Sequence, residues 1–229
     1  MTRTLSEIAG VELVVSPNLI EATQDAGSFV QLSGVLKRVA VKLSKICNDL
    51  RLLSSGPRAG IGEINLPAVQ AGSSIMPGKV NPVIPEVVNQ IAFEVIGNDI
   101  TVTMAAEGGQ LQLNAFEPII AHSLFKSLAH LCAGCRVLGE RCVAGITANR
   151  VRARQLLDDS TALVTALNPY IGYARSSEIA QEALATGRRV YDLVLEKNLM
   201  TREDLDAILK PEVLTQPHFS TLHRPKGDA

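Results

Sequence analysis

One short stretch of the sequence, GSSIMPGKVNP at residues 72–82, concentrates side chains that could do chemistry. Gly72 and Gly78 permit a close backbone approach to a ligand or a positive φ angle. Backbone N–H groups of consecutive small residues can converge on an anion. Lys79 adds a positive charge, and Asn81 adds a directional hydrogen-bond donor. This combination suits the recognition of a carboxylate.

The two serines of this stretch offer a second kind of chemistry. Ser73 or Ser74 could face the carbon of a substrate whose carboxylate is held by the lysine and the asparagine. The same residues also have an ordinary structural interpretation. Gly-Ser-Ser is a common turn, lysine is commonly a solvated surface residue, and Asn-Pro commonly leads into a helix. The residues alone leave both interpretations open.

The position of the stretch in the chain favours a functional loop. It completes a segment, residues 54–82, which Gly and Pro interrupt repeatedly and which lies between two helical patterns. Loops of this length are uncommon inside compact domains, where they are usually functional or disordered linkers. This segment is poor in charge and rich in Ile, Leu, Val and Met, which does not fit a linker.

Long helical patterns flank this loop and must position it. Two seams of apolar residues show the three-and-four spacing of a heptad repeat: Phe29, Leu32, Leu36, Val39, Leu43, Ile46, Leu50 and Leu53, then Leu124, Leu128, Leu131, Cys135, Leu138 and Cys142. Residues 85–107 form a third helical pattern, in which Asn98 takes a position expected to be apolar. Such a polar residue often fixes register or oligomeric state. The patterns predict a helical bundle that other chains complete.

Turn and capping residues divide the chain. Ser16-Pro17-Asn18 is expected to start the first long helix, and Ser55-Gly56-Pro57 to end it. Later helical patterns are shorter, and TRED at residues 201–204 is a capping box. The predicted fold class is therefore all-α. It comprises a long-helix bundle portion over residues 1–144, a small helical C-terminal domain over residues 145–215, and an irregular tail over residues 216–229.

The cysteines invite a metal or redox interpretation. Cys132 and Cys135 form a CxxC pattern, which occurs in zinc and redox sites. No second CxxC and no histidine pair accompany it. Together with Cys142, the two sulfurs fall on roughly one helical stripe, where a free cysteine behaves as a small buried hydrophobe. We therefore predict buried structural cysteines rather than a metal site.

Composition argues against several other classes of function. The net charge is −1 and the pI is about 6.4, which gives no basic field for nucleic acid. No apolar run approaches the ~20 residues of a membrane span, and the first residues lack the apolar core of a signal peptide. We expect a cytoplasmic protein that needs no metal or other cofactor and has no nucleic-acid or membrane partner.

A family resemblance extends these expectations. GSSIMPGKVNP matches the GSSxMPxKxNP signature of the aspartase/fumarase superfamily at every fixed position. NPVIPEVVNQ, MAAEGGQLQLN and GITANR also resemble the aspartase branch of that superfamily. Family members are considerably longer. The chain resembles their C-terminal half, without the N-terminal motifs that bind substrate carboxylates and without the active-site histidine.

The resemblance implies a carbon–nitrogen lyase. The family reaction is the reversible deamination of L-aspartate, a small dicarboxylate, to fumarate and ammonia through a C3 carbanion, or aci-carboxylate. By resemblance, Ser73 is the catalytic base, and Ser74 binds the β-carboxylate of the substrate. Lys79 and Asn81 hold its α-carboxylate. Glu86 resembles the glutamate that orients a histidine from another subunit of a homotetramer.

Two alternatives to this lyase remain open. The first is a class II fumarate hydratase, which uses the same signature loop on malate. The second is a non-catalytic helical assembly module. Because half of the substrate-binding groups of the family have no counterpart here, the chain by itself is expected to be incomplete and inactive.

Overall fold

The computed structural model describes residues 1–56, 58–72, 75–76 and 78–215, and over these residues the secondary structure is almost entirely helical. The all-α prediction is therefore confirmed. The chain divides into two compact units, Met1–Thr147 and Ala148–Ala229. No helix in the described part of the chain combines the length and the apolar character needed to cross a membrane.

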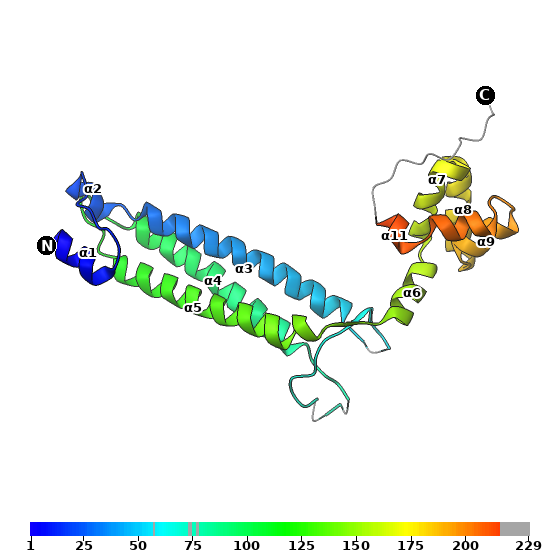
Figure 1. The fold of residues 1–229 in the computed structure, drawn as a ribbon, viewed down its shortest axis with the longest axis horizontal. Coiled ribbons are helices and arrows are strands. Elements are labelled where there is room, and N and C mark those ends of the chain that lie inside the picture. Colours follow the sequence, from blue (N-terminus) through cyan, green and yellow to red (C-terminus); the bar gives the residue numbers. More distant parts are fainter. Residues whose placement is uncertain (57, 73–74, 77, 216–229) are drawn as a thin grey trace. The chain divides into compact units, whose positions relative to one another are not determined.

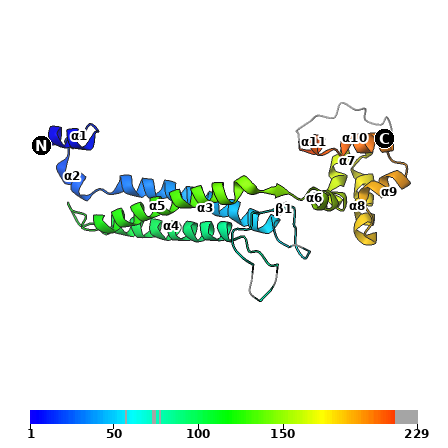
Figure 2. The ribbon, with the colours of Figure 1, turned by 60° about the horizontal axis from the view of Figure 1, so that its bottom comes forward.

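Three long helices build the first unit (Figures 1 and 2). They are α3 (Gly27–Leu53), α4 (Val83–Glu107) and α5 (Glu117–Arg141). They lie side by side, and α4 packs against both of the others. The largest buried cluster of this unit spans all three helices and includes Leu36, Val95, Val102, Ile120 and Leu131. The predicted bundle portion is thus a three-helix array with α4 as its shared element.

The buried face of α3 differs from the predicted seam. Leu36 is buried, but Leu32, Val39 and Ile46 are 41%, 37% and 47% exposed. Small residues lie inside instead, namely Ser33, Ala40 and Cys47. Small side chains let helix backbones approach closely, so the larger residues of the seam face outward. The heptad spacing identified the helix correctly but not its inner face.

A similar shift overturns part of the cysteine prediction. Cys142 is buried, as expected, but Cys132 and Cys135 are exposed. The buried stripe of α5 runs through Leu131, Gly134 and Leu138 instead. At Gly134 a Cβ atom would lie 3.0 Å from Cδ1 of Ile91, so the absence of a side chain lets α4 pack closely. The residue after this contact, Cys135, consequently faces outward.

Two short helices and a tight turn occupy the end of the bundle away from the signature loop. The helices are α1 (Thr2–Ala9) and α2 (Leu19–Gln24). Asn18 caps α2 by accepting hydrogen bonds from the N–H groups of Ile20 and Glu21. The predicted start signal therefore begins this separate short helix rather than α3. The turn between α4 and α5 contacts α2, because Asn114 N–H donates to the Thr23 carbonyl at 3.0 Å.

The segment that joins α3 to α4 is anchored to the far end of α5. Its two-residue strand β1 (Ile64–Asn65) pairs with β2 (Thr147–Ala148), which follows the 3-10 turn η1 (Val143–Gly145). A Cβ atom on Gly145 would lie 2.5 Å from Cγ of Pro67. This close approach holds the first part of the loop against the bundle end.

The second unit is a cluster of short helices around its own core. Its helices are α6 (Arg150–Asp158), η2 (Thr161–Leu163), α7 (Val164–Ile171), α8 (Tyr173–Thr186), α9 (Val190–Glu196), α10 (Arg202–Ile208) and α11 (Pro211–Leu214). Leu167, Leu193 and Leu205 are fully buried in that core. The N-cap of the predicted capping box is present, because the Thr201 hydroxyl accepts from the Asp204 N–H at 3.2 Å, whereas the Asp204 carboxylate accepts from the Thr201 hydroxyl rather than from its backbone N–H. Residues 216–229, the predicted tail, lie outside the described residues.

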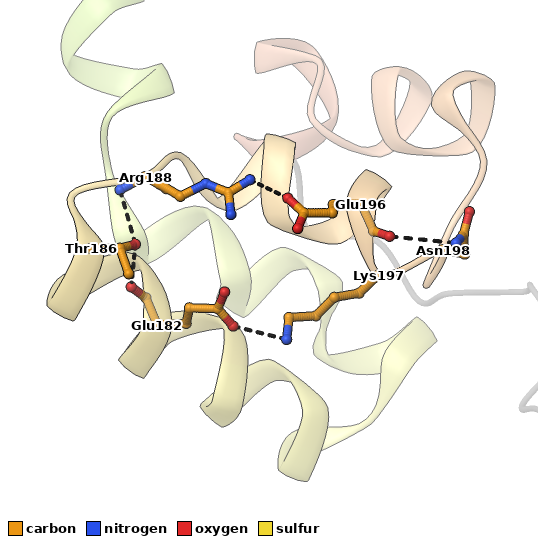
Figure 3. A network of polar contacts seen from close by, with 6 residues as sticks. All are labelled: Glu182, Thr186, Arg188, Glu196, Lys197 and Asn198. Carbon is orange, nitrogen blue, oxygen red and sulfur yellow. Dashed lines mark hydrogen bonds and ion pairs between the residues drawn. The ribbon is translucent and has the colours of Figure 1, made fainter.

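Exposed ion pairs close the connection from α8 to α9 (Figure 3). Lys197 Nζ lies 2.8 Å from Glu182 Oε2, and Arg188 pairs with Glu196. The Arg188 guanidinium lowers the pKa of the Glu196 carboxyl by hydrogen bonding to it. Every charged side chain drawn in this network has a charged partner, so the network has an evident structural role.

Candidate active site

The signature loop is pinched at its base. A Cβ atom on Gly72 would lie 2.5 Å from the carbonyl oxygen of Lys79, closer than real Cβ contacts allow. Gly78 has φ +81°, a left-handed conformation that favours glycine. The Lys79 N–H donates to the Met76 carbonyl at 3.2 Å. Both glycines singled out in the sequence therefore occupy positions where a side chain would strain the backbone.

The loop then leads directly into α4. The Val83 N–H donates to the Asn81 carbonyl at 2.9 Å, and the Glu86 N–H donates to the Pro82 carbonyl at 3.2 Å. Glu86 lies in the first turn of α4, where the helix dipole favours a carboxylate. The rigid helix therefore fixes the Glu86 backbone a few residues after Asn81.

The described polar side chains of the site are available to a ligand. Lys79 is exposed, while Asn81 and Glu86 are half-buried. Within the described residues, no side-chain hydrogen bond or ion pair engages these three polar ends. The structure thus brings Gly72 and Lys79 into contact, and it gives the side chains of Lys79, Asn81 and Glu86 no partner among residues 1–56, 58–72, 75–76 and 78–215. Ser73 and Ser74 lie outside the described residues.

A buried amide one turn beyond Glu86 ties the site to α3. The Asn89 side chain is 2% exposed. Its Nδ2 donates to the Ser44 carbonyl at 3.1 Å, to Ser44 Oγ at 2.9 Å and to Asn48 Oδ1 at 3.1 Å. Its Oδ1 accepts from Arg51 at 3.3 Å. These bonds clamp the start of α4 to the end of α3, the two helices that the loop connects.

The sequence analysis did not single out this amide. Asn89 follows Val88 directly, and both residues are buried. Polar residues at positions 44, 48 and 51 of the facing helix recur at helical spacing. That recurrence, opposite a polar residue next to an apolar stripe, is the signal that could have revealed the clamp.

The histidines lie away from the signature loop, as far as the structure describes them. His130 on α5 pairs through Nδ1 with Glu94, which also pairs with Lys126 at 2.5 Å. Lys126, and after it His130, lowers the pKa of the Glu94 carboxyl. His122 is exposed on α5. Residues 218 and 223, the other two histidines, lie outside the described residues.

Comparison with known proteins places this geometry in a family. The model of a family described as "Lyase" matches residues 1–97, and the model "Fumarase C C-terminus" matches residues 163–216. A crystal structure of a fumarate lyase:delta crystallin from Brucella melitensis superposes with a TM-score of 0.88 at 56% identity, over 94% of this chain and 47% of that one. The chain therefore belongs to the aspartase/fumarase superfamily.

Its similarity to individual members is more specific. The chain is 59% identical over 222 residues to the aspartate ammonia-lyase of Helicobacter pylori, which covers 97% of this chain and 47% of that protein. A class II fumarase from Schistosoma mansoni also superposes, with a TM-score of 0.86 at 34% identity over 95% of this chain and 49% of that one. The chain spans about half the length of these relatives and corresponds to the C-terminal part of the aspartate ammonia-lyases.

Proposed function

We propose that the protein carrying this chain is a carbon–nitrogen lyase that deaminates L-aspartate reversibly to fumarate and ammonia. The observation that carries the proposal is the 59% identity to an aspartate ammonia-lyase over nearly the whole chain. The complete signature at residues 72–82 lies inside that aligned region. We keep the cytoplasm as the predicted location of this reaction.

The chemical requirement of this reaction explains why such a loop is needed. Removal of a proton from C3 of aspartate places a second negative charge on the adjacent carboxylate. Stabilising that developing charge is the main electrostatic task of the enzyme. The base must also lie within hydrogen-bonding distance of the proton that it removes. The signature loop carries residue types for both tasks, since consecutive backbone N–H groups can stabilise negative charge and a serine hydroxyl can serve as the base.

We assign the steps of the reaction to the residues of the loop. Ser73 removes the C3 proton. Loop N–H donors and nearby positive charge lower the pKa of the Ser73 hydroxyl, so that it can act as a base. Ser74 binds the carboxylate that becomes the aci-carboxylate. Lys79 and Asn81 hold the other carboxylate. The exposure of Lys79 and the absence of a described partner for it support this assignment.

The remaining groups of the site come from elsewhere in the assembly. Glu86 orients a histidine that another subunit contributes, within a homotetramer. Exposed apolar side chains on the three long helices support such an association, and they include Leu32, Val35, Ile46, Phe93, Ile100, Met104 and Phe125. An exposed apolar face of this extent on long helices is typical of an interface between chains.

Two substitutions in the protein that carries this chain test the assignment. Ser73→Ala should lower turnover of L-aspartate by ~10² to 10⁴-fold, the usual effect of losing a general base, with little change in substrate binding. Lys79→Ala should lower turnover and, unlike Ser73→Ala, should weaken binding of the substrate and of dicarboxylate inhibitors. Lys42→Ala, an exposed lysine on α3, serves as the control and should change neither quantity. Retention of normal turnover by Ser73→Ala would exclude Ser73 as the base.

A second candidate function rests on the fumarase comparisons. The match to a fumarase C-terminal model and the 34% identity to a class II fumarase favour a hydratase that acts on malate. Parallel assays with L-aspartate and L-malate separate the two candidates. Turnover of malate alone would replace the lyase proposal with the hydratase.

A further inference from the structure

Asn89 contacts three positions of α3 from a single position of α4. Its amide bonds to Ser44, Asn48 and Arg51, which together span about two turns of α3. Contacts on successive turns resist both a sliding and a rotation of α4 against α3. The amide is therefore placed to fix the register of these two helices, which lie side by side (Figures 1 and 2).

The apolar contacts beside the amide fix this register less strictly. Val88, the preceding residue, packs in a buried cluster with Cys47 and Leu138. Apolar burial is non-directional, so these contacts survive a small shift of one helix along the other. Hydrogen bonds depend steeply on distance and angle. A buried amide whose donors and acceptor are all satisfied therefore selects one arrangement of the two helices.

The register at Asn89 reaches the candidate site through the backbone. Glu86 lies three residues earlier on the same helix, about 4.5 Å along its axis. The Asn81 carbonyl accepts from a backbone N–H in the first turn of α4 at 2.9 Å. The other arm of the loop is anchored to α3, since the Glu63 N–H donates to the Leu53 carbonyl at 2.9 Å. A shift of α4 against α3 would therefore move the first two side chains relative to that arm.

We propose that Asn89 is a positioning residue, which sets where Asn81 and Glu86 stand relative to the rest of the signature loop. This role rests on the lyase function proposed above, and it acts through the helix register rather than through contact with the substrate. Reacting groups must be held in a near-attack geometry, and a misplacement of about 1 Å can cost ~10²-fold in rate. The flexible stem of Lys79 tolerates a small shift in ground-state binding. Turnover, rather than substrate binding, should depend on Asn89.

Steady-state kinetics on the whole protein that carries this chain test the proposal. In Asn89→Ala, kcat for L-aspartate should fall at least ~10-fold while KM changes less than ~3-fold, the pattern of a loss confined to the transition state. Ser33→Ala is the matched control, because Ser33 Oγ makes a buried hydrogen bond of 2.8 Å to Asp99 between the same two helices. Asp99 lies about 15 Å farther along α4 than Asn89. Both variants should lower the urea midpoint, but the control should keep a normal kcat.

Amide hydrogen exchange supplies a readout that does not depend on activity. Asn89→Ala should speed exchange in the first two turns of α4 by ~10-fold or more, because about three hydrogen bonds that hold this end are lost. Ser33→Ala should leave exchange in those turns unchanged. If Asn89→Ala fails to fold, Ser44→Ala removes one contact of the amide and should show the same kinetic pattern, with a fall in kcat of ~3-fold.

The outcomes separate this proposal from the proposed function. A normal kcat in Asn89→Ala, an equal fall in Ser33→Ala, or unchanged exchange at the start of α4 overturns the positioning role. If the parent protein turns over malate instead of aspartate, the same ratios measured with malate decide the role. If the parent turns over neither, the lyase proposal fails, and hydrogen exchange alone decides whether Asn89 holds the start of α4.

Discussion

Substitution of Asn89 by alanine tests whether the buried amide clamp stabilises the bundle beside the candidate site. The amide makes its contacts with two donor hydrogens and one acceptor oxygen, so about three hydrogen bonds are lost. Each contributes about 0.5–1.5 kcal/mol net. The half-buried Ser44 and the exposed Asn48 and Arg51 can turn to water instead. We therefore expect the free energy of unfolding to fall by about 3 kcal/mol.

Urea denaturation at a fixed protein concentration measures this change, because an oligomer's apparent stability depends on concentration. Asn48→Ala is the matched control. Asn48 is exposed and makes one of the contacts, so its loss should reduce the free energy of unfolding by less than about 1 kcal/mol. The double variant should reveal a coupling free energy of about 0.5–1.5 kcal/mol between the two residues. A loss below about 1 kcal/mol in Asn89→Ala, or an equal loss in Asn48→Ala, would refute the clamp.

Three further predictions concern the loop, a buried thiol and the completeness of the site. Gly72→Ala places a Cβ atom 2.5 Å from the Lys79 carbonyl, so it should lower kcat/KM for aspartate at least ~10-fold, whereas Gly34→Ala, with open space on α3, should not; equal activities would exclude the pinch. Because burial raises the pKa of Cys47 from 9.0 to about 11, the stability that this thiol contributes is complete below pH 9 and is lost as pH rises to about 11. The free energy of unfolding should fall by about 2–3 kcal/mol more in the parent protein than in Cys47→Ala over this range, and an equal fall in the two proteins would contradict this. The 229-residue chain alone should release no ammonia from aspartate, and the N-terminal half of the Helicobacter pylori relative should restore part of the activity; release by the chain alone would count against a composite site.

Helix positions were predictable from the sequence because apolar spacing reports local periodicity. The inner faces of α3 and α5 were not, because the spacing of large residues does not reveal which stripe meets a neighbouring helix. Ala40 and Gly134 lie inside through the close approach that they permit, while Val39 and Cys135 face outward. Such a choice depends on packing between helices, which only the assembled fold specifies.

Short-range sequence signals were reliable where one side chain caps a helix by accepting a hydrogen bond from a backbone N–H group. The Thr201 cap is present as predicted, and Asn18 does cap a helix, although a different and shorter one. The strands β1 and β2 had no signal in the sequence, since two-residue strands carry no alternation of polar and apolar residues. The backbone roles of Gly72 and Gly78 could be predicted from residue type, whereas the Asn89 clamp depends on a facing helix.

The contact between Gly72 and the Lys79 carbonyl changes the chain entropy of the signature loop. The segment between α3 and α4 is held by β1 and by Pro67 up to residue 67, and the contact isolates a ring from residue 72 to residue 79 within the remaining residues 68–82. Loop-closure entropy grows as the logarithm of length, so ordering the short ring around a substrate is less unfavourable by about 0.6 kcal/mol than ordering residues 68–82. That difference corresponds to roughly a 2.5-fold gain in substrate affinity from chain geometry alone, without any additional contact to the substrate.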